Sequence, residues 1–249
     1  FGTVGSHFYK LCEGRTDLHV AAVLSRRPRP ELTCTVTADY DEIVRDPSID
    51  IVVEVMGGIE PAYSYLCAAM RAGKHVVTAN KQLMCAHFEE LTSLAKEKGV
   101  HTTLDTSGNP FTRDKEFFDK FNELLKYTDL FLLDIKHIDT QAHKELTGQT
   151  NENILDLAQY LSEQKKPVWI RHVLVPGITD SEEYLTRLHD FIETLDNVER
   201  VEVLPYHTLG VFKWEELGIP YSLKDVSTPS KESVDKANEI LETKKYLEK

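Results

Sequence analysis

Charged side chains in the second half of the chain stand where buried segments end. Asp105 closes one expected strand, Asp134 and Lys136 close the next, His207 follows a later one, and Arg171 lies within the strand between them. The carboxyl ends of parallel strands meet at one edge of a sheet or at the mouth of a barrel, so we expect one site. Singly, each residue has a simpler interpretation: a local Asp134–Lys136 ion pair, and a hydrogen-bonded turn at His207.

A glycine turn near the N-terminus is the second candidate. Gly2 and Gly5 of Gly2-Thr3-Val4-Gly5 open a helical segment and fit the second and third glycines of the G-x-G-x-x-G dinucleotide fingerprint. The first glycine and the strand before it are not in the sequence. A plain turn at a helix start is the alternative interpretation.

Apolar runs and helical periodicity alternate along the chain, which is the pattern of βαβ units with parallel strands. The expected strands cover residues 18–24, 50–55, 74–80, 100–105, 129–135, 168–174 and 199–204. The expected helices cover residues 6–12, 61–72, 86–98, 112–126, 151–164, 181–196 and 229–247. We predict an α/β fold with a mostly parallel sheet of about seven strands and a barrel-like order of consecutive strands. Two subdomains are the alternative.

Composition excludes several classes of protein. No apolar run approaches the ~20 residues of a membrane helix, and no signal peptide opens the sequence, so we expect a cytoplasmic protein without a membrane partner. The net charge is −12, and after residue 100 there are 18 Lys and Arg against 28 Asp and Glu. This acidic balance argues against nucleic-acid binding, and we interpret it as solvated helix faces.

The four cysteines are Cys12, Cys34, Cys67 and Cys85, at intervals of 22, 33 and 18 residues. None of these intervals is the two- or three-residue spacing of a zinc or iron–sulfur site. We expect buried, reduced thiols.

The first hundred residues resemble the nucleotide-binding domain of homoserine dehydrogenase. The resemblance is carried by Gly2-Thr3-Val4-Gly5, Val55-Met56-Gly57-Gly58-Ile59-Glu60 and His75-Val76-Val77-Thr78-Ala79-Asn80-Lys81. It implies that the glycine turn (Gly2, Thr3, Val4, Gly5) meets a pyrophosphate, that Gly57, Gly58, Thr78 and Asn80 border a nicotinamide, and that Lys81 has a catalytic role.

Arg26 follows an expected strand at a position where an NAD-preferring site has an acid. A guanidinium there favours NADP, because it pairs bidentately with the 2′-phosphate. A solvated loop is the alternative. The family's substrate domain does not follow residue 100, so we do not expect homoserine oxidation.

Residues 100–249 resemble the C-terminal part of pyruvate formate-lyase activating enzymes, which are radical S-adenosylmethionine (SAM) proteins. The resemblance is carried by Val100-His101-Thr102-Thr103-Leu104-Asp105-Thr106-Ser107-Gly108, Leu132-Leu133-Asp134-Ile135-Lys136, the segment 168–177 and the segment 204–218. It implies that Asp105, Asp134, Lys136 and His207 contact SAM or a cation beside it. Carboxylates and a lysine suit the amino-acid end of SAM, which carries both signs of charge.

The cluster motif of that family, C-x-x-x-C-x-x-C, does not occur in the sequence. We therefore expect no iron–sulfur cluster and no reductive cleavage of SAM. We interpret the chain as a chimera of a truncated Rossmann-like segment (1–99) and a partial (β/α) barrel segment (100–249), with no complete active site and no turnover. Weak binding of SAM or NADP, an NAD(P)-binding module, and a radical SAM enzyme whose cluster is supplied otherwise remain the functional hypotheses.

The two segments join inside one ordinary unit. Lysines end a helix before Gly99, which favours a left-handed turn, and a strand follows that ends in Asp105-Thr106-Ser107-Gly108. The junction therefore obeys local rules. The sequence does not predict the oligomeric state.

Overall fold

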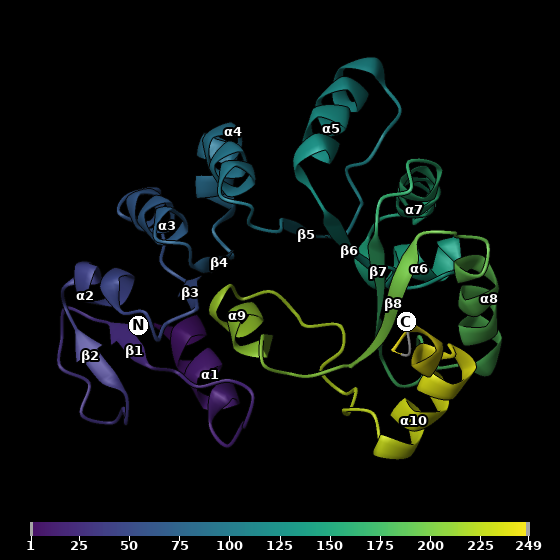
Figure 1. Cartoon of the computed structure of the whole chain (residues 1–249). Helices are drawn as coiled ribbons and strands as arrows, with labels where there is room; N and C mark the ends of the chain where they lie inside the picture. The colour runs from purple at the N-terminus through teal and green to yellow at the C-terminus, as the bar shows by residue number, and fades with distance from the viewer. Residues whose placement is uncertain (1, 248–249) are drawn as a thin grey trace. The chain divides into compact units, whose positions relative to one another are not determined.

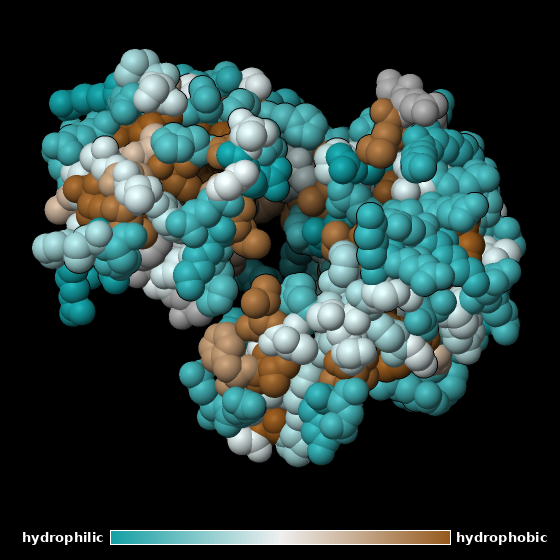
Figure 2. Space-filling model, turned by 90° about the horizontal axis from the view of Figure 1, so that it is seen from below, coloured by the Kyte–Doolittle hydropathy of each residue, from teal (hydrophilic) through white to brown (hydrophobic). Residues whose placement is uncertain are grey.

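The computed structural model describes residues 2–247 and divides into two compact units, residues 1–102 and residues 103–249 (Figure 1). We call them unit 1 and unit 2 and describe each by itself. Within residues 2–247 no helix is long and apolar enough to cross a membrane. One face of the surface shows apolar patches among mostly hydrophilic side chains (Figure 2).

Unit 1 alternates short strands with helices. Its elements are α1 (Thr3–Cys12), β1 (Ala22–Leu24), β2 (Thr35–Thr37), α2 (Tyr40–Arg45), β3 (Ile51–Glu54), α3 (Ala62–Arg71), β4 (His75–Thr78) and α4 (Lys81–Glu97).

The described strands of unit 1 form two parallel pairs, β1 with β2 and β3 with β4. Leu66 and Met70 of α3 pack against Leu83 and Leu91 of α4, and all four are at most 5% exposed. Burying four such side chains stabilises this part by about 6–12 kcal/mol before the entropy of ordering is counted.

Unit 2 follows the same alternation. Its elements are β5 (Thr103–Thr106), α5 (Lys115–Tyr127), β6 (Leu130–Asp134), α6 (Thr140–Thr147), α7 (Glu152–Glu163), β7 (Val168–Leu174), α8 (Glu182–Ile192), β8 (Val198–Pro205), α9 (Val211–Glu216), α10 (Lys231–Ile240) and a 3-10 helix, η1 (Thr243–Tyr246).

The four strands of unit 2 form one parallel sheet in the order β5-β6-β7-β8. Burial alternates along β7, where Val168, Ile170, His172 and Leu174 are buried and the residues between them are half-buried. The buried face packs against α5, α7, α8 and α10 in a single core. The other face of the sheet is free to carry polar side chains, because alternate residues of a strand point to opposite sides.

The predicted α/β class with parallel strands is confirmed, but the strands within residues 2–247 belong to three sheets. The barrel-like order is correct for unit 2. It is wrong between the expected strands 18–24 and 50–55, because β1 pairs with β2, a strand that the sequence analysis did not predict. The first of those strands is also shorter than expected: Leu18 is 39% exposed, and only Ala22–Leu24 pair.

Candidate functional site

Arg171 on β7 joins acidic residues on two neighbouring strands. Its guanidinium Nη2 lies 2.5 Å from Asp105 Oδ1 on β5 and 2.7 Å from Asp134 Oδ1 on β6, and its Nε donates to Asp134 at 2.8 Å. Lys136 Nζ binds the other oxygen of Asp134 at 3.0 Å. Four of the predicted residues thus form one continuous ion-pair network.

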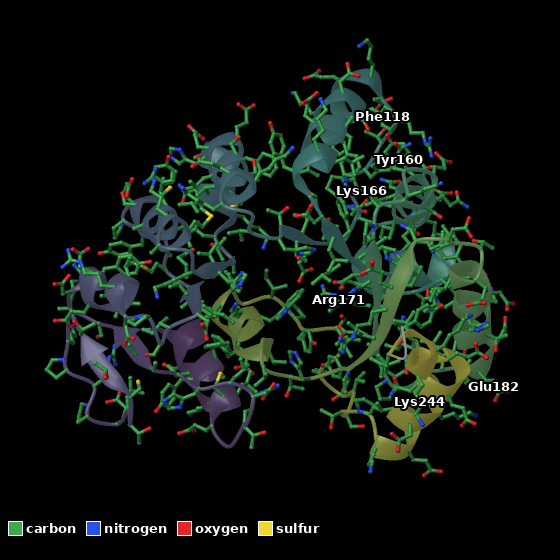
Figure 3. All side chains as sticks on the ribbon, viewed as in Figure 1. Phe118, Tyr160, Lys166, Arg171, Glu182 and Lys244 are labelled. Atoms are coloured by element: carbon green, nitrogen blue, oxygen red, sulfur yellow. The ribbon has the colours of Figure 1, made fainter. Side chains whose placement is uncertain are left out.

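The sheet register explains this convergence. Asp134 pairs with Arg171 across β6 and β7, and β5 lies on the far side of β6. The side chains of Asp134 and Arg171 are 17% and 16% exposed, so the centre of the network is well shielded, whereas Asp105 is 60% exposed. In Figure 3 Arg171 lies on the side of the sheet away from α8, and Phe118 and Tyr160 pack between α5 and α7.

Two opposing effects act on the pKa of Arg171. Burial lowers it, but the hydrogen bonds and charges of Asp105 and Asp134 outweigh burial and hold the pKa above its ordinary value. The guanidinium therefore stays charged at every physiological pH, and its attraction fixes the positions of both carboxylates.

The loop after β5 brings backbone close to the core. Gly108 is buried at φ +69°, and a Cβ placed there would come within 3.0 Å of side-chain atoms of Leu133 and Leu157. Only glycine fits this position without displacing neighbours. Its backbone N–H donates to Thr106 Oγ1 at 3.0 Å, which closes the turn that presents Ser107.

Next to the network lies a cavity of about 200 Å³, to which Asp134 and Lys136 both contribute. Its remaining walls come from the loop after β5 and from α6, α7 and the turn between them, through Ser107, Asn109, His143, Thr147, Gln149 and Ile154. The cavity and the network share the carboxyl edge of β6. Together they are the candidate site of unit 2.

His207, the fifth residue of the predicted set, lies elsewhere. It is exposed in the segment between β8 and α9, and the described ion pairs of the network do not include it. The residue before it, Tyr206, is buried, and its hydroxyl is hydrogen-bonded to the hydroxyl of Tyr221 at 2.8 Å.

Sequence reasoning missed His143, because it did not predict α6. Two signals of that helix were present in the sequence: Asp139, which caps its N-terminus through the backbone N–H groups of Gln141 and Ala142, and Gly148, which ends it in the left-handed conformation. Such a short helix is bounded by its caps rather than by periodicity.

In unit 1 the predicted loops after β3 and β4 meet. Asn80 caps α4 by accepting from the backbone N–H of Leu83 at 3.1 Å, and its side-chain amide donates to the carbonyl of Gly58 at 2.6 Å. Thr78 Oγ1 donates to Glu54 at 2.5 Å, and Glu54 also accepts from the backbone N–H of Met56. Buried Glu54 is a part of this arrangement that sequence reasoning missed.

The other predicted residues of unit 1 lie outside this group of hydrogen bonds. Gly2 is the N-cap of α1, whose first turn contains Val4 and Gly5; the side chain of Thr3 lies outside the described part. Arg26 is exposed in the turn after β1, and Gly57 is exposed after β3. Lys81 is exposed at the first position of α4.

The cysteines are all in unit 1 and are dispersed. Cys12 and Cys67 are buried, Cys34 is half-buried, and Cys85 is exposed, so the expectation of burial is wrong for Cys85 on the polar side of α4. Among residues 2–247, no three His, Cys, Asp or Glu side chains gather as ligands for a metal ion. The thiols present therefore do not fit an iron–sulfur cluster, which needs several thiolates around one centre.

Two family profiles match the sequence. The NAD-binding domain of homoserine dehydrogenase matches residues 1–105, and the radical SAM superfamily matches residues 62–188. The two matches overlap from residue 62 to residue 105, which covers α3, β4 and α4. The predicted resemblance to both families is confirmed, and the radical SAM match begins well before residue 100.

Curated relatives are pyruvate formate-lyase-activating enzymes. That of Listeria monocytogenes is 53% identical over 157 residues, 63% of each chain, and that of Staphylococcus epidermidis is 46% identical over 194 residues, 78% of this chain and 77% of the relative. The chain thus spans 63% of the length of the first of these relatives.

Solved structures similar to the chain come from both families. A domain of the Bacteroides vulgatus activating enzyme is 25% identical with a TM-score of 0.48, covering 63% of this chain and 86% of that one. Staphylococcus aureus homoserine dehydrogenase is 39% identical with a TM-score of 0.37, covering 40% and 29%. From the profile match over half of its length and the identity to curated relatives, the chain belongs to the radical SAM superfamily, among the relatives of pyruvate formate-lyase-activating enzyme.

Proposed function

We propose that unit 2 binds SAM at the ion-pair network. The observation that carries the proposal is the convergence of Asp105, Asp134, Lys136 and Arg171 at the carboxyl edge of β5, β6 and β7. The amino-acid end of SAM carries one ammonium and one carboxylate. The aspartates pair with the first and the two cations with the second, in charge-assisted hydrogen bonds.

The shielding of the network favours a ligand with both signs of charge. Asp134 and Arg171 are mostly buried, so separating them leaves two poorly solvated charges. A zwitterionic group supplies a new partner to each of them, whereas a ligand with one charge leaves the other residue unpaired. SAM fits this requirement through its amino-acid end.

We propose that this chain binds SAM and does not cleave it. SAM supplies a sulfonium that radical SAM proteins cleave with an electron from an iron–sulfur cluster, and the cysteines of this chain do not fit such a cluster. We therefore derive no cleavage step. The function proposed here is SAM binding without turnover.

The proposal includes a chimeric origin for the chain, with a dehydrogenase-type N-terminal part and an activating-enzyme-type C-terminal part. It is supported by the two overlapping family profiles and by the division of the structure after residue 102. Both profiles match the helix-strand-helix segment of α3, β4 and α4, so an exchange there would preserve local structure.

Calorimetric titration with SAM tests the binding proposal. We expect saturable binding that weakens at least tenfold in Asp134→Asn, which removes one buried charge partner. Asp119→Asn is the matched control, because Asp119 is exposed on α5 and pairs with Lys115. Absence of binding to the wild type, or equal effects of the two substitutions, would contradict the proposal.

Reconstitution with iron and sulfide under anaerobic conditions tests the proposed absence of SAM cleavage. We expect a colourless protein after desalting, without a sulfur-to-iron charge-transfer band, and no 5′-deoxyadenosine after reduction in the presence of SAM. A coloured protein that releases 5′-deoxyadenosine would refute binding without turnover.

A second candidate function, NADP binding by unit 1, is favoured by the contact between Asn80 and Gly58, which joins two of the loops implied to border the nicotinamide. A thermal-shift titration with NADPH tests it. We expect stabilisation that is lost in Arg26→Ala and kept in Arg45→Ala, since Arg45 is an exposed arginine on α2 that pairs with Asp41. No shift in the wild type would end this candidate.

A further inference from the structure

A groove at the amino edge of the sheet in unit 2 is lined by two irregularities of the backbone. The groove has a volume of about 910 Å³ and lies where β7 and β8 begin, at the opposite edge from the ion-pair network. Its walls come from the end of α7, the starts of β7 and β8, and Tyr246 and Leu247 near the C-terminus. This volume is typical of sites for small organic molecules.

The first irregularity is a β-bulge at Glu199. The pairing of β7 with β8 skips Glu199, and the next residue, Arg200, pairs with Trp169. Val198 and Val201 are both buried although they are three positions apart, whereas the residues on one face of a regular strand are two apart. The bulge therefore turns Arg200 away from the core and toward Trp169, in the way that bulges re-aim side chains beside functional sites.

Two contacts hold the Arg200 guanidinium in place. Its central carbon lies 4.7 Å from the centroid of the Trp169 ring, in a cation–π contact, and its Nε lies 2.9 Å from Glu202 Oε1. Within residues 2–247, no described ion pair or hydrogen bond uses its two Nη groups. The side chain is 38% exposed and lines the groove. A fixed guanidinium with open Nη groups binds the two oxygens of an oxyanion bidentately.

The second irregularity places Lys165 on the same groove. Lys165 has φ +52° and follows α7 in a Schellman turn, in which its N–H donates to Ser162 and the N–H of Lys166 donates to Leu161. This position favours glycine, because a side chain at positive φ is strained. The Lys165 ammonium has no described partner in the part of the chain that the structure covers. A strained residue that presents an unpaired cation to a groove points to an anionic ligand.

We propose that this groove binds an organic oxyanion, a carboxylate or a phosphate attached to an apolar body. Arg200 and Lys165 bind the oxyanion in charge-assisted hydrogen bonds. The apolar body packs against Pro167 and Trp169, which line the groove beside the two cations. The site lies apart from the ion-pair network, so it does not depend on SAM binding.

Two acidic residues of the groove decide between an anionic and a cationic ligand. Asp196 and Glu199 line the groove and are exposed, so solvent screens their repulsion of an anion without removing it. Glu199→Gln therefore has opposite effects on the two classes: it strengthens the binding of an anion and weakens the binding of a cation.

Fluorescence titration of the full chain tests the proposal in a Trp214→Phe background, in which Trp169 is the single tryptophan. The probes are phenyl phosphate, benzoate and benzylamine, which share a phenyl ring and differ in charge. We expect saturable quenching by at least one of the two anions at about millimolar concentration and binding of benzylamine at least about fivefold weaker. The anion that binds more tightly distinguishes phosphates from carboxylates.

Substitutions then locate the bound anion, with affinities confirmed by calorimetry. Arg200→Leu should weaken its binding by about tenfold, and Lys165→Gly by about threefold without a lower urea midpoint, because glycine is favoured at that position. Glu199→Gln should strengthen it by about twofold. Arg187→Leu is the control and should leave the affinity unchanged, since Arg187 is exposed and pairs with Asp139.

Three results would overturn the proposal. The first is the absence of saturable binding of both anions. The second is a cation site, recognised by benzylamine binding as tightly as the anions or by weaker anion binding in Glu199→Gln. The third is unchanged anion affinity in Lys165→Gly, a variant that keeps the test valid even if Arg200→Leu does not fold.

Discussion

Replacing Gly108 by alanine should destabilise unit 2 through two separable effects. The backbone of Gly108 has φ +69°, a conformation that costs an L-residue about 1–2 kcal/mol. The added methyl would also lie 3.0 Å from side-chain atoms of both Leu133 and Leu157, closer than unstrained contact allows. Moving two fully packed leucines costs typically about 1–3 kcal/mol. We expect a total loss of about 2–5 kcal/mol.

Gly148→Ala isolates the first effect. Gly148 has φ +82°, but nothing lies within 4 Å of a Cβ built there, so we expect a loss of only about 1–2 kcal/mol. Both tryptophans, Trp169 and Trp214, belong to unit 2, so urea unfolding followed by tryptophan fluorescence reports this unit alone. If Gly108→Ala costs no more than Gly148→Ala, the packing around the Asp105–Gly108 loop is not as described.

Three further substitutions test the surroundings of the site. Arg171→Leu should lower the free energy of unfolding of unit 2 by about 2 kcal/mol in urea titrations, because Asp134 loses its shielded partner. The control Arg187→Leu, at a more exposed arginine, should cost under about 1 kcal/mol. Equal losses in the two variants would argue that the network is no stronger than a surface ion pair. Burial lowers the pKa of His172, so the folded state favours the neutral ring. The stability that results is complete above the unfolded pKa of about 6.5 and decreases as pH falls below it. His172→Gln should therefore reduce the loss of unfolding free energy measured between about pH 7.5 and 5. Asn151→Ala leaves the carbonyls of residues 137 and 138 without their amide donor and should cost about 2–4 kcal/mol, measured as a fall in the urea midpoint; a loss below 1 kcal/mol would refute that role.

Local rules predicted the junction well. α4 ends at Glu97, Gly99 has φ +66°, and the backbone N–H of Val100 donates to Ala95 at 2.8 Å. The strand that follows, β5, begins at Thr103 and not at residue 100, because its pairing with β6 begins there. The seven-residue strand β7 was predicted with both of its ends, because it is rich in β-branched and aromatic residues, follows Pro167 and is followed by Pro176-Gly177.

Elements that depend on a few residues escaped prediction. β2 has three residues, and α2, α6 and α9 have six to eight, so none spans the window in which periodicity can be detected. α4 begins at Lys81 and not at residue 86, because Asn80 caps it and a break at His87 (φ −133°) interrupts the helical pattern. Pattern analysis placed the start near the break and missed the turn before it.

The candidate site was predictable where it depends on strand ends. Asp105, Asp134 and Lys136 converge because parallel strands align their carboxyl ends, a rule that requires only the strand assignments. His207 follows β8 by two residues, and the direction in which the chain leaves the sheet decides where it lies. Strand assignments contain no information about that direction. The cavity and His143 depend on packing between α6, α7 and the loop after β5, which no single element encodes.

The network of Arg171, Asp134, Asp105 and Lys136 is proposed to hold the amino-acid end of SAM. The most direct test compares, by calorimetry, the affinity of the protein for SAM with its affinity for 5′-methylthioadenosine, which has the nucleoside and sulfur but lacks the amino-acid end. We predict that SAM binds at least tenfold more tightly, since two charge-assisted contacts are lost in the shorter ligand. Equal affinities, or no binding of SAM, would contradict it.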